Sequence, residues 1–321
     1  MSAAADSSKS GGATGPYKQY LKEHGLLQAY VDDFMDRREK GWIVGASHDS
    51  VLPYEHHQDA FIGRKAAERI EHIEDDFPWY MFVNFQSPHD HFDPPTSLAE
   101  KYRHASMPPP VEPSLQNKPK RVERRHRNFA NATKDDITIA RRQYCAKIEL
   151  IDDQIGLILS TLEATGKIDN TIVVFSSDHG EQLGDHGLFQ KHTAYESSMR
   201  VPLVVAGPGI EPGRSDALVE LFDLNPTLVE LAGLDAQPNL DALSFAPILK
   251  GLQEQHRPYC VTCQHDYRGL RSRTHKYIES YGDHAELYDL TTDTDESYNL
   301  IDEQPELASE LSQRLAERLD T

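Results

Sequence analysis

The residues best suited to chemistry stand side by side near the middle of the chain. Asp178 and His179 follow the short run of apolar, mainly β-branched residues from Thr171 to Phe175. A carboxylate and an imidazole at the end of a strand predict a metal site, because ligands in open α/β sheets bind beyond the carboxyl ends of strands. An isolated Asp-His pair is more often a capped turn, here with Gly180 in the turn. Further polar residues follow closely and favour the functional interpretation: Asp185, His186, Lys191 and His192.

The elements around this pair read as strand, polar loop, short helix and strand. Residues 171–175 have no polar face, which predicts a strand buried on both sides, as in a parallel sheet. Val201 to Ala206 predicts a second strand of the same kind. Upstream, Thr133 is a plausible N-cap of a helix that reaches about Ala164, where Gly166 stops it. Its apolar residues step by three and four and predict one face packed on a sheet: Tyr144, Ile148, Ile151, Ile155, Ile158 and Leu162.

A second polar cluster follows another apolar run. Trp79 to Phe85 predicts an aromatic strand, and His89, Asp90 and His91 come directly after it in a Pro-rich segment. A lone histidine beside a proline is more often an ordinary loop residue. A polar cluster thus follows a second predicted strand, and His91 receives no role.

Helical patterns and a basic run account for most of the first half of the chain. Tyr17 to Arg38 predicts a helix with a break at Gly25, and Asp59 to Ile73 predicts another. Asp32 and Asp33 are interpreted as solvated helix residues, not metal ligands. The basic run from Lys118 to Arg127 is interpreted as an exposed loop.

The last quarter of the chain changes to short strands separated by turns. Tyr259 to Gln264, Leu270 to Ser280 and Glu286 to Leu290 predict an antiparallel sheet, and Pro305 to Leu319 predicts a final helix packed on it. Cys260 and Cys263 form half of a zinc motif, which needs two more ligands. We interpret this pair as structural.

Composition bounds the classes of protein that this chain can represent. The net charge of the 321 residues is −19, which argues against nucleic acid as a partner. No apolar run approaches the roughly 20 residues that span a bilayer, so no membrane is expected. Residues 1–16 are predicted to be a disordered leader without the features of a secretory signal, and we expect a cytoplasmic protein.

Four segments together resemble the sulfatase family of the alkaline-phosphatase superfamily, in the branch of arylsulfatases, choline sulfatases and phosphonate monoester hydrolases. They are Ser-Asp-His-Gly-Glu, Gly-Asp-His-Gly-Leu, Lys-His-Thr-Ala-Tyr-Glu and Arg-Val-Pro-Leu. The resemblance implies that Asp178 and His179 bind a divalent cation, Ca²⁺ first and Mg²⁺ or Mn²⁺ otherwise. It implies that Lys191 holds the sulfate oxygens and that His89 acts on the ester oxygen. His186 and His192 are further candidates for the pocket wall.

The resemblance covers the later part of the family's sequence pattern. In the family, an oxidised Cys or Ser in Cys/Ser-x-Pro-Ser-Arg, formylglycine, is the nucleophile, and an early Asp-Asp pair binds the cation. Neither that motif nor an early strand ending in Asp-Asp occurs here, so formylglycine is not encoded. We expect a sulfate-ester hydrolase that is inactive alone, with a small sulfated substrate. A separate chain that supplies the missing half, or a homo-oligomer, is the expected partner.

The resemblance also implies the fold. We expect an α/β protein with an alkaline-phosphatase-like mixed sheet flanked by helices, without its N-terminal strands. Residues 17–250 would form the partial α/β domain and residues 251–321 a small subdomain of antiparallel sheet and helix. Two other functions stay open: a phosphonate or phosphate ester hydrolase of the same superfamily, and a non-catalytic remnant that binds a partner through its sheet edge.

Overall fold

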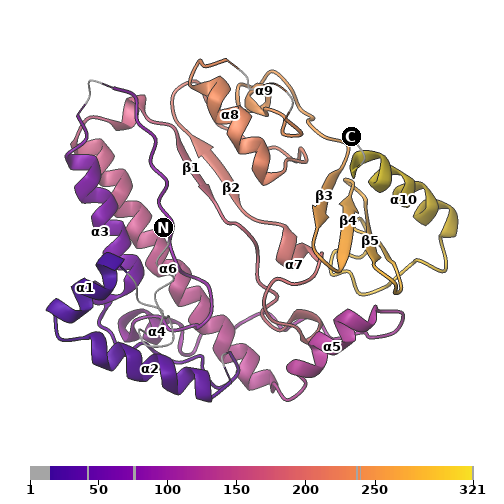
Figure 1. Ribbon diagram of the computed structural model, residues 1–321, viewed down its shortest axis with the longest axis horizontal. Coiled ribbons are helices and arrows are strands. Elements are labelled where there is room, and N and C mark those ends of the chain that lie inside the picture. The colour runs from indigo at the N-terminus through magenta and orange to yellow at the C-terminus, as the bar shows by residue number, and fades with distance from the viewer. Residues whose placement is uncertain (1–14, 42, 75–76, 236–237, 239, 320–321) are drawn as a thin grey trace. The chain divides into compact units, whose positions relative to one another are not determined.

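The computed structural model describes residues 15–41, 43–74, 77–235, 238 and 240–319, and these form two compact units (Figure 1). Unit 1 consists of Met1–Pro109 and Asn131–Asp169, and unit 2 of Pro110–Ala130 and Asn170–Thr321. Most of the predicted leader, residues 1–14, lies outside the described residues. None of the helices in the described ranges is both long enough and apolar enough to cross a membrane.

Unit 1 is built from helices. Three of them meet in a small core, where Ala60 and Leu98 pack against Ala146 and Leu150. The break predicted at Gly25 is confirmed, because one helix ends before it and the next begins after it. The α-helices are α1 (Gly15–Glu23), α2 (Leu27–Glu39), α3 (Gln58–Glu71), α4 (Thr96–Tyr102) and α6 (Lys134–Ala164), with the short 3-10 helix η2 (Tyr54–His56) before α3.

The long helix α6 begins as predicted, but its predicted apolar face is buried only in part. The Thr133 side chain accepts a hydrogen bond from the Asp136 amide, and the Asp136 carboxylate accepts one from the Thr133 amide. The predicted sheet-packing face is wrong in part: Ile148 is exposed, and α6 packs on α3 and α4. The same spacing of apolar residues also allows an adjacent face of the helix to be buried. The small side chain of Ala146 lets α3 and α4 approach that face.

One glycine sets the separation of α3 and α6. A Cβ atom placed on Gly63 would lie 2.5 Å from the Gln154 Oε1 atom, closer than real contacts allow. The two helices therefore approach at a point where any side chain at position 63 would force Gln154 to shift.

Two predictions for the early part of unit 1 need correction. Residues 79–85 are predicted as a strand, but no strand is assigned there within the described residues, and Tyr80 and Phe82 are each 77% exposed. Aromatic content favours a strand, but a ladder also requires a neighbouring strand. Asp33 is not solvated: its carboxylate lies 2.8 Å from the buried Arg37 guanidinium, which also donates to three carbonyl groups in residues 46–49.

Unit 2 contains a two-stranded ribbon that carries the candidate metal ligands. Strands β1 (Val173–Ser176) and β2 (Leu203–Ala206) pair antiparallel, with Val173 opposite Ala206. The parallel pairing and the burial on both faces predicted for this region are wrong, since Val204 is 58% exposed. An apolar run favours a strand, but it does not determine whether the neighbouring strand runs parallel or antiparallel to it. Between β1 and β2 lie the 3-10 helix η4 (Asp185–Gly187) and the helix α7 (Glu196–Met199).

The predicted C-terminal sheet and its covering helix are confirmed. Four antiparallel strands are ordered β3-β4-β5-β6: β3 (Cys260–Cys263), β4 (Tyr267–Arg271), β5 (His275–Ser280) and β6 (Glu286–Asp289). Helix α10 (Pro305–Leu319) packs Leu311 and Leu315 on this sheet. The single strand predicted over residues 270–280 is two strands, because a turn at Ser272–Thr274 divides it. Helices α8 (Leu224–Leu231) and α9 (Ala246–Leu249) precede the sheet.

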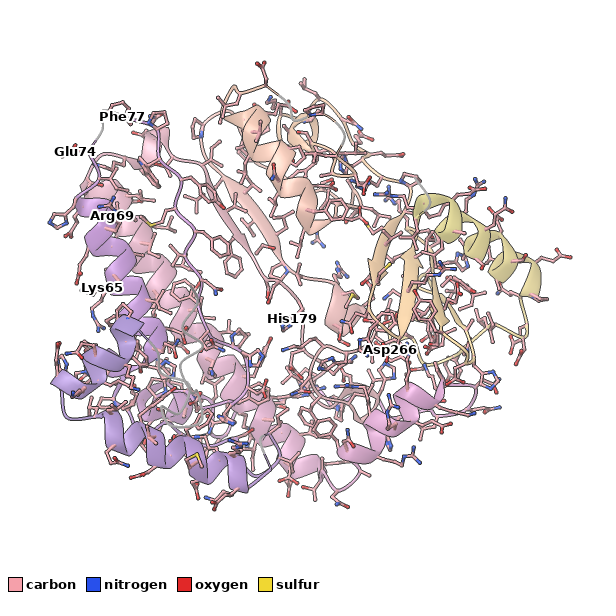
Figure 2. All side chains as sticks on the ribbon, in the orientation of Figure 1. Lys65, Arg69, Glu74, Phe77, His179 and Asp266 are labelled. Atoms are coloured by element: carbon pink, nitrogen blue, oxygen red, sulfur yellow. The ribbon has the colours of Figure 1, made fainter. Side chains whose placement is uncertain are left out.

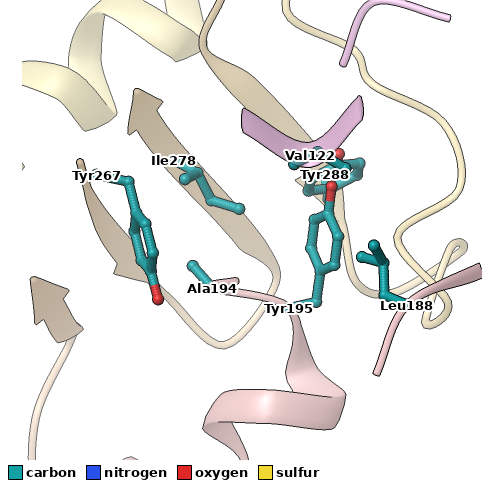
Figure 3. Packing of buried hydrophobic residues seen from close by; sticks show 7 residues of the cluster. All are labelled: Val122, Leu188, Ala194, Tyr195, Tyr267, Ile278 and Tyr288. Atoms are coloured by element: carbon teal, nitrogen blue, oxygen red, sulfur yellow. The ribbon is translucent and has the colours of Figure 1, made fainter. Parts of the chain in front are cut away.

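The basic run, predicted to be an exposed loop, is instead tied into the core of unit 2. It forms helix α5 (Lys120–Asn128), and both Lys118 and Arg121 are buried beside Glu286 on β6. The two cations lie 3.6 Å and 3.3 Å from the Glu286 carboxylate. The hydroxyls of Tyr195 and Tyr288 each donate to the same carboxylate at 2.6 Å. Figure 3 shows these two tyrosines in the apolar cluster around this site.

We expect the substitution Glu286→Gln to lower the free energy of unfolding by about 3–5 kcal/mol, because it leaves two buried cations without their counter-ion. Urea denaturation of the variant and parent measures the difference. Glu317→Ala is the matched control: it breaks the Arg314–Glu317 pair, whose side chains are about half exposed, and should cost less than about 1 kcal/mol. Equal small losses in both variants would contradict the role given to Glu286.

Candidate functional site

The carboxylate of Asp178 stands at the exposed end of β1. Its side chain is 85% exposed, and its Oδ1 atom accepts a hydrogen bond from the His179 amide at 3.0 Å. The Oδ2 atom lies 3.6 Å from the His179 Nε2 atom. The two candidate metal ligands therefore direct an oxygen and a nitrogen into one small region.

The His179 ring is held in one tautomer. Its Nδ1 atom lies 2.9 Å from the Gly180 carbonyl oxygen, which can only accept, so Nδ1 carries the hydrogen. In the neutral ring the lone pair is then on Nε2, on the side of Asp178. A histidine that donates one ring nitrogen to a carbonyl and presents the other is the usual arrangement of a metal ligand.

Gly180 lets the chain turn tightly behind this pair. A Cβ atom at this position would lie 2.0 Å from the Ser197 carbonyl oxygen, so only glycine fits. The Gly180 amide donates to the Ser198 carbonyl at 2.7 Å, which joins the strand end to α7. The sequence assigned Gly180 to a turn but gave no sign of this close approach.

The segment that leads to Lys191 is shaped by hydrogen bonds to its own backbone. The Glu181 carboxylate accepts from the amides of Leu183 and Gln190, and the Gln182 amide donates to the Gln190 carbonyl. These bonds place Gln190, the residue before Lys191, next to Glu181 and Gln182, which follow His179 closely in the sequence. Asp178, His179 and Lys191 all lie in unit 2, and both their shared site and their roles stay predictions.

Positive charge gathers around Lys191. Arg125, on α5, donates to the Gln190 side chain at 3.5 Å. Burial lowers the pKa of His192, and the charges of Arg125 and Lys191 lower it further, while Asp266 opposes them. Asp266 lies in the turn between β3 and β4, and Figure 2 labels it together with His179. The sequence did not identify Arg125, although its place in the basic run was a signal.

His186 does not form a pocket wall. It is buried, and its ring lies 4.8 Å from the ring of Tyr195 in the core of unit 2. Burial, with the charge of Lys118, lowers its pKa to about 4. It adopts a left-handed backbone conformation with φ of 56°. The neighbouring Asp185 carboxylate accepts from the Val111 amide at 2.8 Å, so this part of the loop is structural.

The candidate His89 lies in unit 1, on the loop that follows residues 79–85. Its Nδ1 atom is 2.9 Å from the Asp90 carboxylate and its side chain is about one-third exposed. Behind this loop, Asp59 accepts hydrogen bonds from the Gln86 and Ser87 amides at 2.7 and 3.2 Å. His91 is buried, and burial lowers its pKa.

The donor set fits a divalent cation in part. Asp178 and His179 supply an oxygen and a nitrogen of the right chemical types. Among the residues that the structure describes, no three His, Cys, Asp or Glu side chains gather into a metal-binding group. Cys260 and Cys263 lie on β3, where burial raises the pKa of the Cys260 thiol to about 12, against its use as a thiolate ligand.

Comparison with known structures establishes the fold. The phosphonate monoester hydrolase of Agrobacterium radiobacter superposes with a TM-score of 0.81 at 22% identity, over 95% of this chain and 68% of that one. A putative sulfatase from Bacteroides thetaiotaomicron superposes with a TM-score of 0.70 at 25% identity, over 82% of this chain and 63% of that one. The chain thus has the alkaline-phosphatase-like α/β fold.

Comparison with families and sequences is more specific. The Sulfatase family model matches residues 14–234, and a model described as N-sulphoglucosamine sulphohydrolase, C-terminal, matches residues 184–321. The chain belongs to the sulfatase family. It is 30% identical to a choline-sulfatase of Rhizobium meliloti over 82% of this chain and 55% of that protein. It is also 30% identical to an arylsulfatase of Clostridium perfringens, over 70% and 49% respectively. The chain spans about half the length of these curated relatives.

The pKa of His186 makes stability depend on pH. The unfolded chain takes up this proton near the ordinary value of 6.5 and the folded chain only near 4, so stability is full above 6.5 and falls as the pH drops towards 4. Between about pH 7.5 and pH 5, the parent should lose about 2 kcal/mol more stability than His186→Asn. Asparagine suits the left-handed backbone. Denaturant unfolding at both pH values checks this, and parallel losses in both proteins would contradict it.

Proposed function

We propose that this chain carries the metal-binding and sulfate-binding half of a sulfate-ester hydrolase. The observation that carries the proposal is the strand-end pair Asp178–His179, with His179 fixed in the tautomer of a metal ligand. Lys191 follows on a loop folded back by Glu181. Membership of the sulfatase family and the names of the relatives support sulfate esters as the substrate class.

Each residue has a proposed task. Asp178 and His179 would hold a divalent cation, Ca²⁺ first, which when bound neutralises charge on the sulfate oxygens. Lys191 binds the sulfate oxygens, and Arg125 adds positive charge beside Lys191 in a chain whose net charge is −19. His89 gives a proton to the leaving ester oxygen. A small sulfated molecule is the proposed substrate.

We expect Ca²⁺ or Mn²⁺ to bind the purified chain weakly, because one carboxylate and one imidazole give few ligands. Isothermal titration measures the affinity. Asp178→Ala should weaken binding at least about tenfold, as loss of a ligand does. Asp152→Ala, at an exposed position of α6, is the control and should bind as the parent does. Equal affinity in all three proteins would refute the metal site.

We expect the 321 residues assayed alone to hydrolyse no aryl sulfate, with or without Ca²⁺ or Mn²⁺, because they encode no Cys/Ser-x-Pro-Ser-Arg nucleophile. The assay includes an aryl phosphonate monoester as the alternative substrate. Metal-dependent turnover that Asp178→Ala abolishes would refute the predicted inactivity and identify a different nucleophile. Faster phosphonate than sulfate cleavage would then favour the alternative function. Association without metal binding would favour a non-catalytic interaction protein.

A further inference from the structure

The imidazole of His89 rests on a buried carboxylate from the next residue. Its Nδ1 atom lies 2.9 Å from the Asp90 Oδ1 atom and 2.8 Å from the Asp90 carbonyl oxygen. Both partners accept hydrogen bonds, so Nδ1 carries the hydrogen and the neutral ring has its lone pair on Nε2. Only 1% of the Asp90 side chain is exposed, against 35% for His89. A buried carboxylate therefore lies beneath a ring whose edge reaches solvent.

A cation from α6 fixes the backbone on both sides of Asp90. Lys147 is buried, and its ammonium group donates to the carbonyl oxygens of His89 and His91 at 2.9 and 2.7 Å and to the Asp93 carboxylate at 2.8 Å. An ammonium group has three hydrogens, so these three acceptors use all of its donors. Lys147 lies between the core residues Ala146 and Leu150 in the sequence, and a lysine on the buried side of a helix was the signal that sequence reasoning missed.

The start of the same loop is held from α3. The Asp59 carboxylate, which is fully buried, accepts from the Gln86 amide and from both the amide and the hydroxyl of Ser87. Burial alone would raise the pKa of Asp59, but hydrogen bonding to His57 and the charge of Lys147 outweigh it and hold this pKa below its usual range. The carboxylate thus stays charged and keeps its three donors. The loop of residues 86–93 is fixed at both ends before any ligand arrives.

We propose that Asp90 is the positioning residue of His89: its carboxylate holds the ring in the Nδ1–H tautomer and stabilises the imidazolium that gives its Nε2 proton to the leaving ester oxygen. This inference rests on the role proposed above for His89. An oxygen nucleophile from outside these 321 residues forms the new bond to sulfur as the bond between sulfur and the ester oxygen breaks. The bonding pair stays on the ester oxygen, which takes the Nε2 proton, and His89 becomes neutral with its Nδ1–H still hydrogen-bonded to Asp90. A nearby carboxylate with this geometry orients the acid–base histidine in other hydrolases.

Of the carboxylates Asp59, Asp90 and Asp93, Asp90 is the one placed to position the His89 ring. The Asp93 carboxylate already accepts a hydrogen bond from Lys147, and the Asp59 carboxylate already accepts one from the loop backbone. The charged and titratable groups described around the loop include Tyr17 of α1, Tyr30 and Arg37 of α2, His57 and Asp59 at the start of α3, Lys147 of α6, and Asp90, His91 and Asp93 of the loop itself.

Nitrogen-15 NMR of the imidazole groups in the full chain tests the proposal directly. A His89→Gln variant assigns the His89 signals by their loss. In the parent we expect a roughly tenfold excess of the Nδ1–H tautomer, as a hydrogen bond to a charged acceptor favours. Dominance of the Nε2–H tautomer in the parent would overturn the proposal without any substitution at Asp90.

The isosteric variant Asp90→Asn removes the charge and keeps the shape. We expect the titration midpoint of His89 to fall by about one pH unit, because a neighbouring carboxylate favours the imidazolium. Asp152→Asn, at an exposed position of α6, is the matched control and should leave it unchanged. An unchanged midpoint in Asp90→Asn, with a native circular dichroism spectrum, would overturn the proposal. If that variant does not fold, the tautomer in the parent decides.

These measurements need no turnover, so they separate this inference from the proposed function. Failure to find metal binding that depends on Asp178 would leave the tautomer result standing as a property of the loop. Failure of the tautomer test would leave the sites at Asp178, His179 and Lys191 untouched.

Discussion

Unit 2 depends on one buried carboxylate. Glu286 receives two tyrosine hydroxyls and two cations, and these four groups come from three segments that are far apart in the chain. Burying any of these charges alone would cost several kcal/mol, so the segments are stable together and unstable apart. The consequence reaches the candidate site, because the helix anchored by Lys118 and Arg121 also carries Arg125, which meets Gln190 beside Lys191.

The two histidines with proposed chemical roles are oriented by the same kind of hydrogen bond. His89 and His179 each commit Nδ1 to an acceptor of the adjacent segment and present Nε2. The first has a carboxylate as well as a carbonyl behind it, which suits a group that gains and loses a proton. The second has a carbonyl behind it, which suits a ring that presents Nε2 to a cation. The different acceptors, more than the residue type, separate the two proposed roles.

Signals within a short stretch of sequence predicted the elements that are stabilised by residues close in the sequence. The capped start of α6, the break at Gly25, the antiparallel C-terminal sheet and helix α10 all follow from caps, turn residues and periodicity. The failures concern partners distant in the sequence. The sequence from Lys118 to Arg127 does not indicate that two of its cations pair with Glu286. The apolar run at residues 79–85 likewise does not indicate whether a neighbouring strand is present.

The candidate site follows the same division. Asp178 and His179 were predicted from their types and their place after a strand, Lys191 was predicted from the family resemblance, and the roles of all three stay predictions. His186 was misassigned because a histidine in a polar loop looks the same whether its ring faces a ligand or Tyr195. Asp59, Asp90 and Lys147 were missed as a group, because the contacts that unite them with the His89 loop join α3, α6 and that loop across the chain.

The tight packing of Gly180 couples the strand end to the C-terminal sheet mechanically. The Ser197 carbonyl occupies the space that a Cβ atom at Gly180 would need, and the Ser198 carbonyl accepts from the Gly180 amide, so the residue after His179 is tied to α7. The same helix begins at Glu196, which is ion-paired to Lys276 and Arg271 on the sheet. The candidate metal ligands therefore have a rigid linkage rather than a hinge behind them, and a displacement of the sheet of about an ångström would be transmitted to the His179 ring instead of being absorbed.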